Sequence, residues 1–201
     1  KQALLIDPNH YNSHLFLSMI YTTEGKGDSA RPNVQRTVKI DPLNPWSYLM
    51  SGAVEIFDGQ FSQAVDFLRK GYELESLPFL KFWIAKALAY NNKLDEACPL
   101  LNSVSIEAPG TVWDQMALFF MHAIKGENSK ALEMVSEDFI IAMKDDAWFA
   151  IFTADSYALM DLKEESIEWV EKGVHCTMPF INYPFINEYD PHLKTIRGEE
   201  R

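Results

Sequence analysis

The sequence is poor in cysteine, glycine and proline. Its 201 residues include only 2 cysteines, 9 glycines and 10 prolines, whereas 47% are hydrophobic. This composition excludes disordered, collagen-like and low-complexity chains and indicates a globular protein. Cys98 and Cys176 lie far apart and outside any CxxC or Cys/His spacing. They therefore indicate neither a zinc site nor a disulfide framework, and we expect a cytoplasmic location.

Long apolar runs are also absent. The most apolar neighbourhoods, 79–90 and 116–124, are interrupted by lysine or histidine, and neither approaches the roughly 18 residues that a membrane-spanning helix needs. The chain opens without a basic and then apolar leader. Its first residue is Lys1 and not methionine, so we expect the chain to be part of a longer protein.

Basic residues are outnumbered by acidic ones. The chain has 18 Lys and Arg against 29 Asp and Glu, a formal net charge of −11. Nucleic-acid phosphates are bound by clustered cations, so this balance argues against a nucleic-acid partner. A protein or peptide partner with basic flanks suits the charge of the chain better.

Enzyme motifs are missing as well. The sequence contains no GxGxxG, GxxxxGK[ST], GxSxG or HExxH pattern. His10 and His14 could share a helix face as metal ligands, but a site needs further ligands, and a structural role is favoured. We expect His122 to be a core or groove residue and Cys98 to be a buried cysteine. The sequence thus predicts no catalytic residue, no metal and no cofactor.

The main positive signal is an internal repeat. A small residue followed four places later by an apolar residue recurs five times, at intervals of 33 to 35 positions. Fixed periods of this length indicate a repeat architecture. The five pairs are Ala30/Val34, Ala64/Leu68, Ala97/Leu101, Ala131/Val135 and Ser166/Val170.

Each unit has the pattern of two helices joined by a turn. In the second unit, 46–57 and 61–74 are predicted helices, and Gly59 can adopt the left-handed conformation between them. Prolines such as Pro42 and Pro109 follow the second helices, where a helix must stop. One hairpin cannot bury its apolar face alone, so neighbouring hairpins are expected to stack into a solenoid.

This 34-residue pattern resembles the tetratricopeptide repeat (TPR) family. The first complete unit carries it in Leu17-Ser18, Tyr21, Ala30, Val34 and Pro42, the second in Gly52, Phe61, Ala64 and Leu68, and the third in Ala97, Leu101 and Pro109. The resemblance implies an all-α, right-handed α-α superhelix of about five hairpins. Residues 1–10 would end a preceding repeat, and residues 11–178 would form the repeats 11–44, 45–77, 78–111, 112–146 and 147–178.

The fourth unit departs from the family pattern. Phe119 occupies a position where the other units mostly have a small residue, and Asp138 stands where the family prefers a small apolar one. We therefore expect this repeat to be distorted.

Residues 179–201 are predicted to form a capping segment, cut short at Arg201. Asp190-Pro191 is a helix-start signal, and we expect a short helix through about Arg197. Its apolar contacts would come from Phe180, Tyr183, Phe185 and Leu193. The segment is similar to the end of TPR regions in bacterial multidomain signalling proteins of kinase, cyclase or winged-helix regulator type. That similarity implies an output domain before Lys1.

In TPR proteins the first helix of each pair lines the concave surface, and here that helix repeatedly carries aromatic residues. Side chains at offsets of 3 and 4 share one helix face. The sequence therefore predicts a partner-binding groove, with Lys86 and Asp155 exposed in it. The rings could equally be core, because core positions recur at the same period. The predicted groove residues are Trp46, Leu49, Phe79, Phe82, Lys86, Trp113, Met116, Phe120, Trp148, Ile151 and Asp155.

These residues favour a protein-interaction module that anchors a peptide by apolar side chains, because aromatic residues dominate interface energetics. The groove lacks the basic and amide residues with which one TPR class holds a peptide's terminal carboxylate: Leu15, Leu49, Met50, Phe82 and Trp83 stand there instead. Acidic Asp155 and Glu55 would favour basic flanks on the partner. Self-association through the groove or the C-terminal end is a further expectation. The alternative function is a small-molecule sensor that regulates an attached domain.

Overall fold

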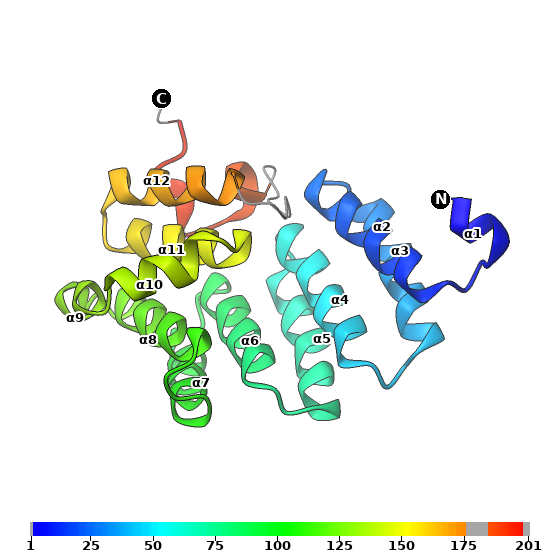
Figure 1. Cartoon of the computed structure of the whole chain (residues 1–201), viewed down its shortest axis with the longest axis horizontal. Helices are drawn as coiled ribbons and strands as arrows, with labels where there is room; N and C mark the ends of the chain where they lie inside the picture. The colour runs from blue at the N-terminus through cyan, green and yellow to red at the C-terminus, as the bar shows by residue number, and fades with distance from the viewer. Residues whose placement is uncertain (1, 176–184, 199–201) are drawn as a thin grey trace.

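The computed structural model describes residues 2–175 and 185–198, and all regular structure in these two ranges is helical. The prediction of an all-α protein is confirmed. After the short helix α1 (Gln2–Ile6), consecutive helices pack side by side in pairs (Figure 1). The first three pairs are α2 (Tyr11–Thr23) with α3 (Gly27–Ile40), α4 (Pro45–Phe57) with α5 (Phe61–Leu74), and α6 (Pro78–Tyr90) with α7 (Leu94–Glu107).

The second half of the chain continues the array with α8 (Val112–Ile124), α9 (Asn128–Glu133), α10 (Glu137–Lys144), α11 (Ala147–Leu159) and α12 (Lys163–Val174). Two short elements follow, the π-helical turn η1 (Phe185–Tyr189) and the 3-10 turn η2 (Leu193–Thr195). Each proposed repeat between 11 and 178 contains one such hairpin, although the exact boundaries stay a proposal.

Local chemistry explains where the helices begin and end. Asn44 caps α4 by accepting a hydrogen bond from the Trp46 N–H at 3.0 Å, and Pro45 is the first helical residue. Gly59 follows this helix with a φ of 72°, a conformation that glycine adopts without steric cost. The sequence predicted both the helix and its turn.

The repeating small residues lie where the two helices of a hairpin touch. Ala30, Ala64, Ala97 and Ala131 are fully buried. A Cβ added to Gly52 would lie 2.5 Å from Leu68 Cγ, well inside van der Waals contact. The spacing of these residues therefore reflects the close approach of the paired helices.

The fourth hairpin is irregular, as predicted. Its second half is divided into α9 and α10, with Ser136 capping α10 by accepting a hydrogen bond from the Phe139 N–H at 3.1 Å. Phe119 of α8 is fully buried and makes edge contacts with Phe139 and Tyr157. A large ring thus fills the seam where other hairpins have a small residue, which fits the break in the second helix.

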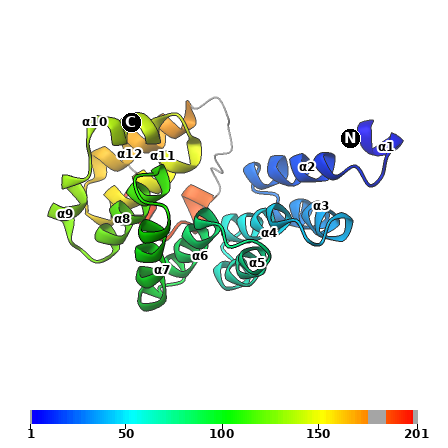
Figure 2. The same ribbon diagram turned by 60° about the horizontal axis from the view of Figure 1, so that its bottom comes forward.

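The C-terminal segment folds back onto the helical array. Figure 2 shows its salmon ribbon beside α6, and η2 also contacts α11. Asp190 caps the turn that leads into η2 by accepting hydrogen bonds from the N–H groups of His192 and Leu193, and Leu193 is fully buried. The predicted helix through Arg197 is only partly correct, because η2 is a single 3-10 turn. The predicted contacts of Phe180 and Tyr183 lie outside the described residues, as does the side chain of Phe185.

Among the described residues, no helix combines the length and the apolar character that crossing a membrane requires. The first helices of the hairpins, α2, α4, α6, α8 and α11, carry the residues considered next, and we call this side of the array the inner wall.

Candidate aromatic pocket and the buried polar cluster beside it

A cavity of about 380 Å³ opens near the first turns of α4, α6, α8 and α11. Trp46, Phe79, Trp113 and Trp148 each stand at the second position of their helix. The hairpin repeat therefore brings these four rings to one place. We call this cavity the aromatic pocket; it is lined by Met19, Trp46, Leu49, Met50, Ala53, Phe79, Trp83, Trp113, Asp146, Trp148 and Phe149.

One wall of the aromatic pocket is a row of rings in contact. Trp46 stacks on Phe79 with a centroid distance of 5.2 Å, Phe79 lies 6.0 Å from Trp113, and Trp113 lies 4.7 Å from Phe149. Trp46 is 53% exposed, whereas Phe79 and Trp113 are partly buried. The rings thus support one another and keep part of their surface accessible.

A second wall stands across this row. Trp83 and Trp148 meet edge to face, with centroids 4.9 Å apart and planes at 77°. Phe57 packs behind Trp148 at 5.0 Å. Trp83 is nearly buried, so its neighbours hold the ring in place.

Asp146 is the one charged residue among those that line the aromatic pocket. Its Oδ1 accepts hydrogen bonds from the backbone N–H groups of Trp148 and Phe149, at 2.8 and 3.2 Å, and so caps α11. Asp146 thus ends the turn between α10 and α11 as a helix-capping residue. The carboxylate also gives the rim of the pocket a negative charge.

Five of the predicted groove residues line the aromatic pocket: Trp46, Leu49, Phe79, Trp113 and Trp148. The remaining apolar ones lie deeper. Phe82, Met116 and Phe120 are fully buried, and Ile151 is 8% exposed. Phe82, Met116 and Ile151 stand three residues after the pocket ring of their own helix, and Phe120 stands seven residues after Trp113. Leu49 has the same repeat position as Phe82 and does line the cavity, so the repeat position alone does not decide which side chains reach it. A partner-binding role for the pocket residues stays a proposal.

The prediction that Lys86 and Asp155 are exposed is wrong. Both are fully buried, and Lys86 Nζ forms an ion pair with Asp155 Oδ2. Phe120 lies against the same ammonium group, its ring centroid 3.8 Å from Nζ. The two charges, one on α6 and one on α11, neutralise each other inside the protein because burial penalises an isolated charge far more than a paired one.

Glu55 gives a similar correction. It is 5% exposed, and its carboxylate accepts hydrogen bonds from Arg31 Nε and Nη2 at 3.0 and 2.9 Å. Arg31 also pairs with Asp58. This carboxylate is therefore held by the neighbouring hairpin, and neither it nor Asp155 presents a free charge to a partner.

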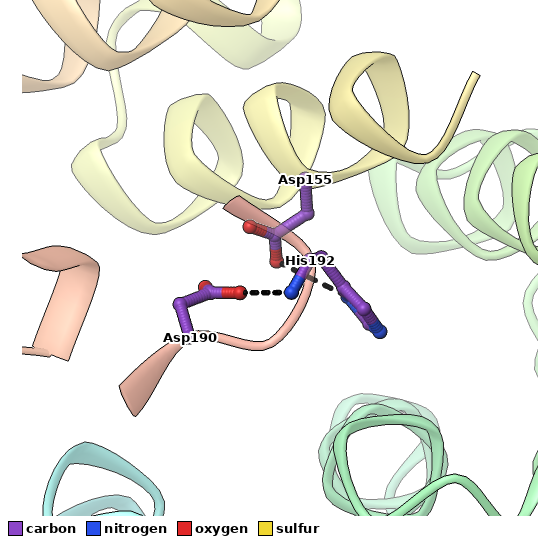
Figure 3. A group of neighbouring side chains, drawn as sticks. All are labelled: Asp155, Asp190 and His192. Atoms are coloured by element: carbon purple, nitrogen blue, oxygen red, sulfur yellow. Dashed lines mark hydrogen bonds and ion pairs between the residues drawn. The ribbon is translucent and has the colours of Figure 1, made fainter. Parts of the chain in front are cut away.

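The C-terminal segment completes the polar cluster around Lys86. Figure 3 shows Asp155 on α11 facing Asp190 and His192. The Tyr90 hydroxyl donates to Asp155 Oδ2 at 2.6 Å and lies 3.2 Å from Asp190 Oδ2. We call these five residues, Lys86, Tyr90, Asp155, Asp190 and His192, the buried polar cluster.

Burial controls the protonation of this cluster. Desolvation raises the pKa of Asp190 well above its usual value, and the neighbouring charge of Asp155 raises it further. Desolvation also lowers the pKa of His192 to about 3, reinforced by the charge of Lys86. Both groups are therefore driven towards their neutral forms beside the Lys86–Asp155 ion pair.

Asp155, Asp190 and His192 could in principle hold a metal ion, because their ligand atoms lie within 4.8 Å of one another. The Lys86 ammonium group, however, already supplies a cation to Asp155. A divalent ion would have to displace it and ionise Asp190. The geometry therefore favours an ion pair that fastens the C-terminal segment over a metal centre.

A second cavity, of about 490 Å³, lies beside η2. Tyr90 and His192 line it together with Ile124, Leu159 and Lys194. Because the C-terminal segment forms one of its walls, this cavity depends on the docking of that segment.

The remaining polar candidates have structural partners. His10 caps α2, His14 lies 3.0 Å from both Asn33 Oδ1 and Pro8 O, and His122 Nδ1 lies 2.6 Å from Glu127 Oε2. The contact of His122 with Glu127 was not predicted from the sequence. Cys98 was expected to be buried but is only partly buried, and this partial burial raises the pKa of its thiol.

Several pocket residues escaped the sequence prediction of the binding set. Trp83, Met50 and Phe149 stand next to residues that the repeat pattern selected, and Asp146 was not among the predicted groove residues. The period and the offsets of 3 and 4 select one face of each helix. They do not show that neighbouring positions on the same helix also reach the cavity.

Solved structures with the same fold are TPR proteins. PilW, a type IV pilus biogenesis factor, has a TM-score of 0.60 with 14% identity over 97% of this chain and 86% of its own. YrrB, described as a TPR protein with an unusual peptide-binding site, has a TM-score of 0.52 with 14% identity over 86% of this chain and 89% of its own.

A kinesin light chain from Podosopora anserina with nearly identical TPR-like repeats has a TM-score of 0.53, with 18% identity over 83% of this chain and 94% of its own. No family model matches the chain, and no curated protein is significantly similar to it in sequence. The chain thus has the TPR solenoid fold, as the sequence resemblance implied.

Proposed function

We propose that this chain is a protein-interaction module that binds a peptide segment of a partner protein in the aromatic pocket. The observation that carries the proposal is the convergence of Trp46, Phe79, Trp113 and Trp148 around one cavity, with part of their surface accessible. Tryptophan is the residue type most enriched at interface hot spots. A cavity lined by preformed rings also binds without a large ordering cost.

The fold supports the same proposal. TPR solenoids present an inner wall built by rigid helices, and the structure of YrrB is described as having a peptide-binding site. The net charge of −11 favours a partner segment with basic flanks. We further propose that the module is the interaction part of a larger signalling protein, on the sequence similarity of its C-terminal segment to such proteins.

The second candidate is a small-molecule sensor. A volume of about 380 Å³ falls within the range of about 300–1,000 Å³ typical of small-molecule sites, and the lining is mostly apolar. In that case the occupant of the aromatic pocket would be a metabolite, and its binding would act on an attached domain.

Photocrosslinking from inside the pocket tests the proposal. Trp46 is replaced by p-benzoylphenylalanine, and a matched probe is placed at Leu132, which is 43% exposed on α9 outside the pocket. We expect a peptide-linked adduct from position 46 alone. The adduct should be lost when Phe79, the stacking partner of Trp46, is also replaced by alanine.

Two results would count against peptide binding. A small-molecule adduct at position 46, identified by mass spectrometry of the intact protein, would support the sensor instead. Equal peptide adducts from positions 46 and 132, or adducts that survive Phe79→Ala, would show that the aromatic pocket is not the binding site.

A further inference from the structure

The ring planes of the aromatic pocket differ in orientation. Trp83 and Trp148 are at 77° to each other, and Trp113 and Phe149 at 58°, whereas Trp46 and Phe79 are nearly parallel at 27°. A flat guest cannot stack on walls that face in such different directions. A compact, rounded guest can contact several of these rings at once.

The electrostatics of the lining select the charge of such a guest. Among the described residues that line the aromatic pocket, there is no Lys, Arg or His, and Asp146 supplies a carboxylate. Ring faces carry a negative quadrupole, and tryptophan provides the strongest attraction for a cation. The formal charge of −11 adds a long-range field of the same sign.

We propose that the aromatic pocket is a cation-binding cage, which accepts the side-chain ammonium group, bare or N-methylated, of a basic peptide segment of the partner. This inference rests on the proposed function and adds the chemistry of the anchor. Trp46, Phe79, Trp113 and Trp148 surround the alkylated ammonium group, and Asp146 neutralises its charge. The apolar remainder of the lining accommodates the methylene stem.

Tryptophan itself provides the assay. Of the five tryptophans, four line the pocket and the fifth, Trp169, lies on α12 outside it. The indole N–H resonances of a ¹⁵N-labelled sample therefore contain four reporters and one internal reference. The probes are capped peptides, Ac-Gly-Ser-X-Ser-Gly-NH₂, in which X is lysine, trimethyllysine or the neutral tert-butyl isostere of trimethyllysine.

We expect trimethyllysine and lysine peptides to shift the four pocket indoles and to leave that of Trp169 unchanged. Their affinity should exceed that of the neutral isostere by roughly five- to thirty-fold, the range that a desolvated cation–π contact provides. Tetramethylammonium chloride, compared with sodium chloride at equal ionic strength, tests whether the pocket binds a free quaternary ammonium ion and not a peptide side chain. We expect it to bind more weakly than the trimethyllysine peptide because it lacks the stem.

Variants separate charge from shape. Asp146→Asn keeps an oxygen that can cap α11 but removes the charge, and Asp145→Asn makes the same change in net charge at a residue that does not line the cavity. We expect only Asp146→Asn to weaken the binding of the trimethyllysine peptide, by about three- to ten-fold. Trp46→Ala, at a half-exposed ring, should weaken it without unfolding the chain.

Equal binding of the tert-butyl isostere, or equal effects of the two aspartate variants, would overturn the cation cage while leaving an apolar peptide groove intact. If tetramethylammonium bound as tightly as the trimethyllysine peptide, the proposal that the bound ammonium group belongs to a peptide side chain would be refuted. If no probe shifts a pocket indole at millimolar concentration, the cage is refuted, and photocrosslinking from position 46 then decides separately whether the pocket binds any peptide.

Discussion

Replacing Lys86 by methionine should destabilise the protein more than any loss of packing would explain. Methionine fills much of the lysine volume and can pack against Phe120, so the change mainly removes the cation that faces Asp155. Removing one partner of a buried ion pair typically costs about 3–5 kcal/mol. The cost arises from the carboxylate left behind.

Protonation sets an upper limit to that cost. A carboxylate stranded without its cation can take up a proton, which for an aspartate with the ordinary reference pKa near 3.9 costs about 4 kcal/mol at pH 7 and about 1.5 kcal/mol at pH 5. We therefore expect Lys86→Met to lower the free energy of unfolding by about 3–4 kcal/mol at pH 7, and by less at pH 5. Urea unfolding followed by circular dichroism measures both values.

The double variant Lys86→Met/Asp155→Leu is the matched control, because it removes both charges together. Replacement of a buried ion pair by apolar residues is often neutral or stabilising, so the double variant should be more stable than Lys86→Met alone. Hydrogen exchange should show lost protection at Leu193 in the single variant, because the cluster holds the C-terminal segment. The reasoning would be refuted if the double variant were no more stable than Lys86→Met, or if the cost of Lys86→Met did not depend on pH.

Three further changes test other parts of the structure. Gly52→Ala should lower the melting temperature. Overpacking against Leu68 typically costs about 1–3 kcal/mol, which exceeds the gain in helix propensity of about 1 kcal/mol. An unchanged or raised melting temperature would contradict the close approach of Gly52 to Leu68. His192 has a pKa of about 3 in the folded protein, so its stabilising contribution is complete above pH 6.5 and is lost as the pH falls. Between pH 7 and 5, the free energy of unfolding of wild type, measured by urea titration, should therefore fall by about 2 kcal/mol more than that of His192→Gln. Parallel pH profiles of the two proteins would contradict this. Arg31→Met should cost about 3 kcal/mol by stranding the buried carboxylate of Glu55, and a loss below 1 kcal/mol would show that this pair is not a structural link.

The sequence predicted the solenoid well because its determinants are local and repeated. A small residue such as Ala64 or Gly52 is required wherever two helices of a hairpin touch, and that requirement recurs in every unit. The left-handed turn at Gly59 is equally local. A distortion of the fourth hairpin could be foreseen because the large Phe119 stands at a position that is small in the other units, but its form, a break between α9 and α10, could not.

Exposure was less predictable, because core and groove positions share the same period. Trp46 and Phe82 stand three positions apart in the repeat, and both positions recur in every unit, yet one ring is half exposed and the other fully buried. The difference depends on which position is covered by neighbouring hairpins, and the sequence of one unit does not encode that.

The pairing of Lys86 with Asp155 depends on still longer-range geometry. The two residues lie on helices two hairpins apart, and Tyr90 and Asp190, which complete the cluster, are 100 positions apart. A linear pattern shows two charges on helix faces, and the simplest expectation is that both are exposed. Only the curvature of the array and the return of the C-terminal segment bring them together.

The inner wall is consequently divided between two kinds of recognition. Near the first turns of the helices it holds an open aromatic pocket with one carboxylate, and further along the same helices Lys86 and Tyr90 receive Asp190 and His192 from the chain itself. The C-terminal segment therefore occupies a place on the wall that a long bound peptide would otherwise cover. Under the proposed function, a partner would add only a short anchored segment at the aromatic pocket unless it displaced Asp190, and that displacement would uncover the Lys86–Asp155 pair. The buried polar cluster would then limit the length of the bound peptide, while the rings and Asp146 would determine which side chain anchors it.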